Sequence, residues 1–321
     1  MSTRVVVVVL NWNSYGVTAD CLRSLRRSSH ADLTVLLVDN GSVDGSPEQL
    51  ETEFPEAIVL RNSRNLGFTG GMNAGMRHAP ISDADYVLLL NNDTIVDPEA
   101  ISEMVRALEA DPHAALACPK IYFWDVPEIL WFAGGRLSCW NGIGVNIGRR
   151  VRDRGQYDVP GEISFANGCA VLLRRSALET LGLFDPDLFA YAEDVDYSFR
   201  ALRSGQRMLY VPQARIWHRE GFASKRNIGN PKRIYYGTRN LLLVMCKHVR
   251  WYHWLTLAPN FMVNWVCRFV FLSVIRRERP GAVVCEMIRG VRDFLRMSSG
   301  RAPQFGEPRT LAAHETAVAQ P

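Results

Sequence analysis

Three carboxylates crowd the segment AYAEDVDYSFR, residues 190–200, where Glu193, Asp194 and Asp196 fall within four positions. Such crowding costs repulsion unless the acids begin a helix, where the dipole and unpaired N–H groups favour negative charge, or take part in a reaction. At about 100° per residue, Asp196 lies one turn from Arg200 at the i, i+4 spacing of an ion pair, whereas Asp194 points elsewhere. Asp196 therefore has a structural explanation, and Asp194 is the candidate for acid–base chemistry.

Two other positions could hold a divalent cation. Asp93 follows the apolar run YVLLL and is preceded by Asn91 and Asn92, a set of hard oxygen donors suited to Mg²⁺ or Mn²⁺ with a bound diphosphate. The structural alternative for Asp93 is an Asx turn that ends the strand. His218, in IWHRE, also follows a strand-like segment, and a lone histidine is more often structural than a ligand. Both interpretations stay open for each residue.

Two further turns could contact a nucleotide. Asp39 in LLVDNGSVDGS could accept hydrogen bonds from a ribose or a base, or cap the turn that NGS makes. The glycines of NLGFTGGMNAGM let the backbone approach a ligand, and we expect a helix from near Gly71 with N–H groups directed at an anion. Neither G-x-G-x-x-G nor G-x-x-x-x-G-K-[ST] occurs in the chain, which argues against a dinucleotide-binding fold and a P-loop.

The elements that position these turns alternate along the chain. Continuous apolar runs predict buried strands and amphipathic patterns predict helices, in this order: strand 4–10, helix 17–27, strand 34–38, helix 47–54, strand 57–60, helix 71–78, strand 86–90 and helix 98–109. Such alternation predicts an α/β fold with a mostly parallel sheet, whose ligand site lies at the carboxyl ends of the strands. Residues 120–165 are expected to form long loops over the site. A strand at 167–175, a short helix (SALETLG), a helix closed by Gly205 and the strand RMLYV follow.

Composition restricts the class of protein. The 321 residues, 47% of them hydrophobic, suffice for one large domain with an appendage or for two domains. The seven cysteines are scattered and form no C-x-x-C pair, so we expect a reducing, cytoplasmic setting without disulfides or a zinc site. Val5–Leu10 is expected to be a buried strand and not part of a secretory signal.

The C-terminal part is basic and aromatic. Residues 225–309 contain 16 Lys and Arg against 4 Asp and Glu. Pro259 and Arg268 interrupt the apolar stretch there, so an interfacial helix on an anionic membrane is favoured over a spanning helix. Packing of this helix on the catalytic domain is the alternative of equal weight. We expect a peripheral position at the inner face of the cell membrane, no nucleic-acid partner, and a disordered tail over residues 299–321.

The order of these motifs resembles the family 2 glycosyltransferases with a GT-A fold, and more closely their rhamnosyltransferase-like bacterial branch. The resemblance runs from Val5 to about Leu243 through VVVLNWN, VDNGSVDGS, NLGFTGGMNAG, LLLNNDTIVDP, NGCAVLLRR, the segment LFDPDLFAYAEDVDYSFRALRSGQRMLYVPQARIWH, and YYGTRNLLL. It implies a catalytic domain over residues 1–230 and a helical region over 231–298 that associates with acceptor or membrane, ahead of the tail.

The resemblance also implies roles for individual residues. Asp194 would be the general base, with Glu193 either a helper or a helix-start residue, and Asp93 and His218 would hold Mg²⁺ or Mn²⁺. The first acid of the family's Asp-x-Asp motif is Asn91 here, which puts its contribution to the metal or ribose in doubt. The residues implied in nucleotide-sugar binding are Asn11, Asn13, Asp39, Asn65, Gly67, Gly71, Asn73, Asn91 and Asn92.

The implied activity is an inverting, metal-dependent transfer of one sugar from a nucleotide-sugar to a hydroxyl of a lipid-linked, such as polyprenyl-linked, or polysaccharide acceptor. A dTDP-rhamnose donor is suggested by the branch alone, and UDP- and GDP-sugars remain open. The Q-x-x-R-W motif of processive synthases is absent from the sequence, which favours single-sugar transfer. The alternative is a catalytically idle relative that binds nucleotide-sugar or membrane. The presence of Asp93, Glu193, Asp194 and His218 argues against that alternative.

Overall fold

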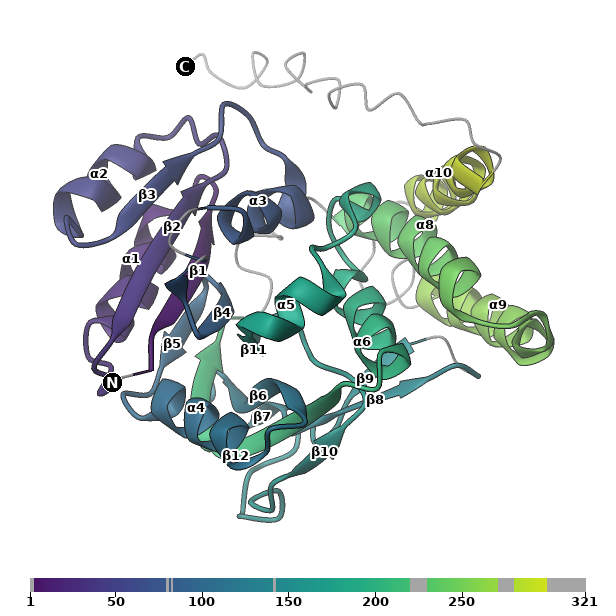
Figure 1. Ribbon diagram of the computed structural model, residues 1–321. Coiled ribbons are helices and arrows are strands. Elements are labelled where there is room, and N and C mark those ends of the chain that lie inside the picture. The colour runs from purple at the N-terminus through teal and green to yellow at the C-terminus, as the bar shows by residue number, and fades with distance from the viewer. Residues whose placement is uncertain are drawn as a thin grey trace, which may run out of the picture.

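The computed structural model describes residues 3–78, 81, 83–140, 143–219, 230–270 and 280–298, so the predicted disordered tail lies outside the described residues. A large sheet forms the centre of the molecule (Figure 1). Its main path runs through β10 (Gly161–Ile163), β12 (Arg207–His218), β6 (Ala114–Phe123), β11 (Ala170–Arg174), β4 (Tyr86–Asn91), β1 (Val5–Asn11), β2 (Leu33–Asp39) and β3 (Ile58–Arg61). The short strands β5 (Thr94–Val96) and β7 (Leu130–Phe132) pair with β12 and β6.

Strand direction agrees with the predicted mostly parallel sheet. β3, β2, β1 and β4 are parallel neighbours, and β12 is parallel to β6. β11 runs antiparallel to both β4 and β6, so β6 and β12 share the direction of the first four strands. The register pairs Asn11 with Asp39 and Leu10 with Asn91. The polar residues that end β1, β2 and β4 therefore lie at one edge of the sheet.

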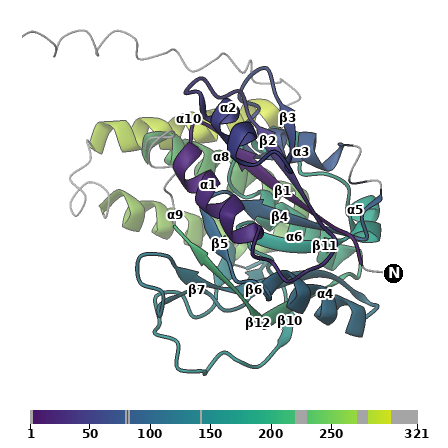
Figure 2. The ribbon, with the colours of Figure 1, turned by 90° about the vertical axis from the view of Figure 1, so that its left-hand side faces the viewer.

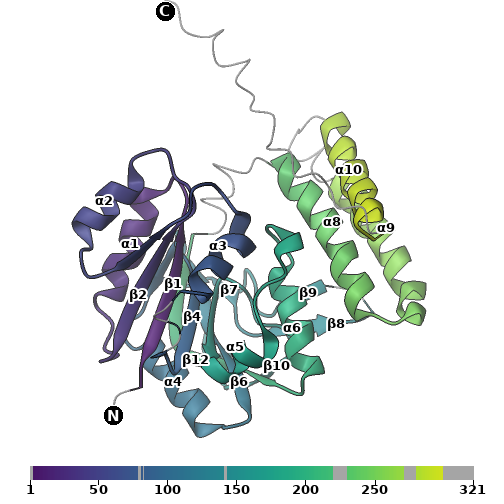
Figure 3. The ribbon, with the colours of Figure 1, turned by 45° about the horizontal axis from the view of Figure 1, so that its top comes forward.

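Helices cover the sheet between its strands. Their bounds are α1 (Tyr15–Leu25), α2 (Ser46–Glu53), α3 (Gly67–Met76), α4 (Ala100–Ala110), α5 (Arg175–Leu181), the 3-10 turn η2 (Pro186–Leu188) and α6 (Glu193–Arg203). Figure 2 shows α1 in front of the strands, and Figure 3 shows α1 and α2 on the opposite side of β1 and β2 from α3. Each helix that the sequence predicted in residues 1–205 is present, with shifts of a few residues at its ends.

The start of α3 corrects a prediction. We expected the helix to begin near Gly71, but it begins at Gly67. A Cβ at Gly71 would lie 2.5 Å from Leu10 Cδ1, and a Cβ at Gly75 would lie 2.5 Å from Val8 Cγ1. These two glycines therefore let α3 lie close against β1, and Gly71 does not present a helix N-terminus to an anion.

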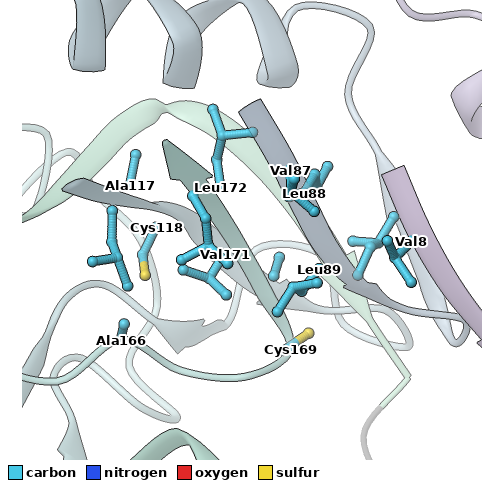
Figure 4. Packing of buried hydrophobic residues seen from close by; sticks show 14 of the residues in the cluster. Val8, Val87, Leu88, Leu89, Ala117, Cys118, Ala166, Cys169, Val171 and Leu172 are labelled. Atoms are coloured by element: carbon cyan, nitrogen blue, oxygen red, sulfur yellow. The ribbon is translucent and has the colours of Figure 1, made fainter. Parts of the chain in front are cut away.

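The core confirms that the apolar runs of β1, β4 and most of β2 are strands covered on both faces, whereas the predicted burial of residues 57–60 is wrong, because β3 is an edge strand whose residues are exposed or half-buried. In Figure 4, side chains of β1, β4, β11 and β6 interdigitate, among them Val8, Leu88, Leu172 and Ala117, all with no exposed surface. Burial of this continuous apolar surface provides most of the driving force for folding.

The prediction of long loops over residues 120–165 is partly wrong. β6 continues to Phe123, and β7, β10 and a separate hairpin of β8 (Gly135–Ser138) and β9 (Ile143–Asn146) follow. The sequence concealed β6 because Lys120 interrupts its apolar run, yet Lys120 is only 1% exposed. Its ammonium contacts the carboxylates of Asp153, at 3.0 Å, and Asp158. A buried lysine paired in this way is compatible with a central strand.

The C-terminal region forms helices that lie together beside the sheet. α8 (Asn230–His248) packs on α6 and on α10 (Pro280–Ser298), and α9 (Trp254–Val270) follows the 3-10 turn η3 (Trp251–His253) (Figure 3). Within the described residues, none of these helices has the length and apolar character needed to cross a bilayer. α8 is thus a packed helix, whereas α9 exposes several large apolar side chains: Leu255, Met262, Val263, Val266 and Val270.

Candidate active site

A cavity of about 820 Å³ opens at the carboxyl edge of the sheet. The polar ends of β4 and β12, the start of β11 and the start of α6 all contribute to its wall. The structure therefore joins segments that are far apart in the sequence. The site residues predicted from the sequence that line this cavity are Asn65, Gly67, Asn91, Asn92, Asp93, Glu193, Asp194 and His218.

Asp93 and His218 meet in the cavity wall. Asp93 lies in the turn between β4 and β5, and His218 is the last residue of β12, which pairs with β5. His218 Nε2 lies 3.1 Å from Asp93 Oδ1, and both side chains are nearly buried. Burial lowers the pKa of His218, but the sulfur of Cys169 and the Asp93 carboxylate together raise it well above its ordinary value. This position thus attracts positive charge.

The residues around this pair fit a divalent cation. Asn91 Oδ1 is buried and has no hydrogen-bond partner among the described residues, and His218 Nδ1 is likewise without one. Asn91, Asp93 and His218 all face the cavity and together offer one carboxylate, one amide oxygen and one imidazole. In the part of the chain that the structure describes, no group of three or more His, Cys, Asp or Glu side chains is arranged to hold a metal ion. Magnesium is commonly held by one or two carboxylates together with substrate phosphates and water, which this donor set allows.

Glu193 and Asp194 begin α6 on another side of the same cavity. Asp194 accepts hydrogen bonds from the backbone N–H groups of Val195, at 2.9 Å, and Gly168, at 3.3 Å. Burial raises the pKa of Asp194, and these N–H groups oppose the increase. Burial, followed by the charge of Asp194, raises the pKa of Glu193 to about 8.

The two acids have different surroundings. The pKa of Glu193 is raised to about 8, and its Oε2 has no hydrogen-bond partner in the described structure. Backbone N–H groups at the helix start bind the carboxylate of Asp194 and stabilise its ionised form against the effect of burial. Of the two acids, Asp194 is therefore the one whose negative charge the helix start stabilises.

Asp196 forms the ion pair that the helical spacing predicted. Arg200 Nε donates to Asp196 Oδ2 at 2.9 Å. A second partner was not predicted: His248, the last residue of α8, places Nε2 2.7 Å from Asp196 Oδ1 and stacks on Phe199. Burial acts to raise the pKa of Asp196, but His248 and Arg200 outweigh it and lower the pKa. Asp196 thus joins α6 to α8 and lies outside the cavity lining.

Five predicted nucleotide-binding residues lie outside the cavity lining: Asn11, Asn13, Asp39, Gly71 and Asn73. Asp39 accepts hydrogen bonds from Asn11, at 3.0 Å, and from both the hydroxyl and the backbone N–H of Ser42. These hydrogen bonds give Asp39 the role of capping the turn after β2, which was the structural alternative to nucleotide binding. Asn13 accepts a hydrogen bond from the backbone N–H of Val43 and so binds the same turn.

Asn73 differs clearly from expectation. Its amide donates to Phe184 O at 2.8 Å and accepts from Phe184 N at 2.9 Å, and the side chain is 1% exposed. Both ends of the amide are therefore used to fix the chain after α5 onto α3. Asn65 does face the cavity, and its Oδ1 accepts from Gly67 N at the start of α3 and from Asn40 Nδ2.

Several cavity residues were missed by the sequence analysis. They are aromatic and basic side chains: Trp12, Phe68, Trp131, Arg149, Phe165, Phe189, Tyr191 and Arg233. Four of them, Trp12, Phe68, Phe189 and Tyr191, lie within the quoted motifs but were not singled out there. The other four lie outside the motifs, and the β7–β9 region and α8 that carry most of them reach the cavity only through tertiary packing. The β8–β9 hairpin also touches the C-terminal helices: Thr256 donates to Trp140 O at 3.1 Å, and Trp140 packs edge-on against His253.

The fold is that of the GT-A glycosyltransferases. The chain is similar to a mannosyltransferase of Pyrobaculum calidifontis solved with GDP-Man and Mn²⁺, with a TM-score of 0.55 and 16% identity over 94% of this chain and 77% of that one. It is also similar to residues 1–349 of Staphylococcus aureus TarS, with a TM-score of 0.57 and 15% identity over 94% and 83% of the two chains. These likenesses define the architecture.

Sequence comparison gives the family. The family described as "Glycosyl transferase family 2" matches residues 6–182, more than half of the chain, and the protein belongs to it. It is 28% identical to an N-acetylglucosaminyl-diphospho-decaprenol L-rhamnosyltransferase of Mycobacterium tuberculosis, over 64% of this chain and 73% of that one. It is 29% identical to the galactofuranosyltransferase GlfT1 of the same species, over 64% and 66%. The chain is a glycosyltransferase, as the motifs predicted.

Proposed function

We propose that this glycosyltransferase moves one sugar from a nucleotide-sugar to an acceptor hydroxyl with inversion at the anomeric carbon. In such a displacement a base removes the proton of the attacking hydroxyl while negative charge develops on the departing nucleoside diphosphate. Asp194 is the base, and the Asp93–His218 side of the cavity receives the diphosphate. The observation that supports this proposal best is that both groups line one cavity although 101 positions separate Asp93 from Asp194.

The proposal includes a divalent cation, Mg²⁺ or Mn²⁺, held by Asp93 and His218 with Asn91 beside them. When bound, the cation supplies neutralising charge to the leaving diphosphate. Mn²⁺ in the mannosyltransferase structure of the same fold supports this assignment.

The donor side of the cavity is proposed to be the edge near β1, β2 and α3. Asn65, Gly67 and Asn92 line it directly, whereas Asp39 and Asn11 shape it from behind through their hydrogen-bonded turn. Trp12 and Phe68 provide aromatic surface on which a nucleobase could stack. The similarity to a rhamnosyltransferase makes dTDP-rhamnose the first donor to test, with UDP- and GDP-sugars next.

The acceptor is proposed to be a lipid-linked glycan of the cell envelope. This follows from the two mycobacterial relatives, one of which is named for a diphospho-decaprenol acceptor. The exposed apolar residues of α9 and the excess of basic residues in the C-terminal part support peripheral contact with an anionic membrane, on its cytoplasmic face. The cavity wall from α8, with Arg233 and Leu241, would then face the acceptor.

Release of nucleoside diphosphate tests the proposal. Nucleotide-sugars are screened with and without a polyprenyl-diphosphate acceptor, and the product is examined by NMR for inversion. Asp194→Asn is expected to bind the donor normally and to lose more than 1000-fold in transfer rate, because it cannot accept the proton. Turnover within tenfold of wild type would place the base elsewhere. Glu179→Gln, which changes an exposed acid on α5 outside the cavity lining, is the matched control and should stay active.

A further inference from the structure

The backbone just before the catalytic acids is strained. Phe189, Tyr191 and Ala192 have φ angles of +59°, +71° and +68°. Side chains with a Cβ rarely adopt this left-handed region, and each such residue needs surrounding structure to hold it there. In the described chain only five non-glycine residues have positive φ, and three of them lie in this one segment.

The strained segment is part of the active site. Phe189, Ala190, Tyr191 and Ala192 all line the cavity, and Glu193 and Asp194 follow directly. Phe189 also abuts Gly67, where a Cβ would come within 2.5 Å of the Phe189 side chain. The path of residues 187–192 therefore sets where the first turn of α6, and with it the Asp194 carboxylate, lies in the cavity.

Two buried residues of α8 bind the backbone of this segment. Asn240 Nδ2 lies 2.7 Å from the carbonyl oxygens of both Leu188 and Ala190 and 2.8 Å from that of Tyr191. Arg239 Nη2 donates to the carbonyl oxygens of Asp187, at 2.7 Å, and Leu188, at 3.1 Å.

The two side chains also bind each other. Arg239 Nε donates to Asn240 Oδ1 at 2.8 Å, which fixes the amide with its N–H groups toward the loop. Neither residue has exposed surface. One turn earlier, Tyr236 stacks on Phe189 with ring centroids 5.1 Å apart. A buried guanidinium and amide directed at backbone carbonyls are not required for simple helix packing, for which apolar side chains suffice.

We propose that Arg239 and Asn240 are positioning residues that hold residues 187–192 in the strained conformation needed to aim Asp194 at the acceptor. They act through the loop and touch neither substrate. The inference rests on the proposed function, in which Asp194 is the base. It assigns to the C-terminal helices an indirect part in catalysis, through the position of residues 187–192, in addition to any contact with membrane or acceptor.

The same helix supplies a control. At the far end of α8, Arg203 of α6 donates to the carbonyl oxygens of His248, at 2.7 Å, and Lys247, at 3.3 Å. Arg203→Gln weakens the docking of α8 on α6 without touching residues 187–192. A purely structural role for Arg239 and Asn240 predicts the same behaviour for Arg203→Gln and Asn240→Ala, whereas the positioning role predicts that they differ.

The test combines exchange and kinetics on the full chain. Hydrogen–deuterium exchange of the peptide covering residues 186–193 should rise at least tenfold in Asn240→Ala and stay at the wild-type level in Arg203→Gln. With the donor found in the screen, kcat should fall about 100-fold in Asn240→Ala, since small misplacements of a catalytic group have effects of this size. The dissociation constant of the nucleoside diphosphate, measured by calorimetry, should change less than threefold.

A pH profile separates positioning from general destabilisation. Opening of the loop would hydrate Asp194, so the acid limb of kcat/KM should move to lower pH in Asn240→Ala and stay in place in Arg203→Gln. Arg239→Lys keeps the charge but loses the bond to Asn240. If Asn240→Ala does not fold, the same exchange, kinetic and pH measurements are made on Arg239→Lys, with the same expected results. Equal kcat and equal exchange in Asn240→Ala and Arg203→Gln would overturn the inference. A wild-type chain that transfers no sugar would overturn the proposed function instead, while the exchange measurement still decides whether Arg239 and Asn240 hold residues 187–192.

Discussion

Replacement of Glu193 by Gln tests the electrostatics of the site through protein stability. Glu193 is 9% exposed, and burial together with the charge of Asp194 raises its pKa from 4.5 to about 8. The unfolded chain releases this proton near pH 4.5 and the folded chain near pH 8. Between these values the folded state binds more protons, so the free energy of unfolding falls as pH rises, and the loss is complete above pH 8.

The size of the effect follows from the same values. At about 1.4 kcal/mol per pH unit, the interval from 4.5 to 7 corresponds to a loss of about 3 kcal/mol at pH 7. Glutamine has the shape of the protonated acid but does not titrate. Glu193→Gln should therefore equal wild type near pH 4.5 and exceed it by about 3 kcal/mol at pH 7.

Equilibrium urea unfolding from pH 4.5 to pH 9, followed by tryptophan fluorescence, measures this difference. Glu179→Gln is the matched control, because Glu179 is exposed on α5 and pairs with Arg175. Its effect should stay within about 0.5 kcal/mol at every pH. A difference between Glu193→Gln and wild type that does not grow with pH would refute a buried, neutral Glu193.

Three other predictions concern metal, packing and membrane. Asp93→Ala should weaken Mn²⁺-dependent binding of nucleoside diphosphate at least tenfold in a calorimetric titration, and unchanged metal dependence would remove Asp93 from the metal site. Asp196→Asn should lower the free energy of unfolding by about 3 kcal/mol at pH 7, because it leaves Arg200 and His248 without their carboxylate. The pKa of Asp196 is lowered in the folded chain, so this difference should shrink as pH falls below 3.8; a pH-independent difference would contradict the ion-pair explanation. The chain should sediment with anionic liposomes at low salt and be released by high salt, and Met262→Glu on α9 should reduce the fraction that sediments at low salt. A wild-type chain that stays in the supernatant at low salt would favour a purely packed C-terminal region.

The sequence predicted the parts of the fold in which local pattern and burial agree. The apolar runs that became β1, β2 and β4 are covered on both faces, and the turns after them reach one edge because parallel strands end together. The same pattern could not predict the full length of β6, because the burial of Lys120 depends on an ion pair with Asp153, which is distant in the sequence. The start of α3 was misplaced for a similar reason: Gly71 serves close packing on Leu10 and not a helix end.

The site shows the same division between local and tertiary information. Helical spacing correctly assigned Asp196 to Arg200, since both residues lie on one helix. The partner His248 is 52 positions away and has no local signature. Asp93 and Asp194 were singled out from their local sequence, and the order of motifs implied their roles. Much of the aromatic and basic wall of the cavity comes from segments whose sequence does not reveal where they fold. The role of Asn240, on α8, is likewise not visible in the sequence, because it depends on the carbonyl groups that face its side chain.

The β8–β9 hairpin connects the cavity wall to the C-terminal helices. β9 contributes Gly144, Val145 and Asn146 to the cavity wall, and Trp140, between the hairpin strands, rests on His253 and on the first turn of α9. A displacement of α9 by a lipid surface would thus move Trp140 and, through the β8–β9 hairpin, the cavity wall. The proposed membrane surface and the proposed sugar pocket would then be coupled through this one hairpin.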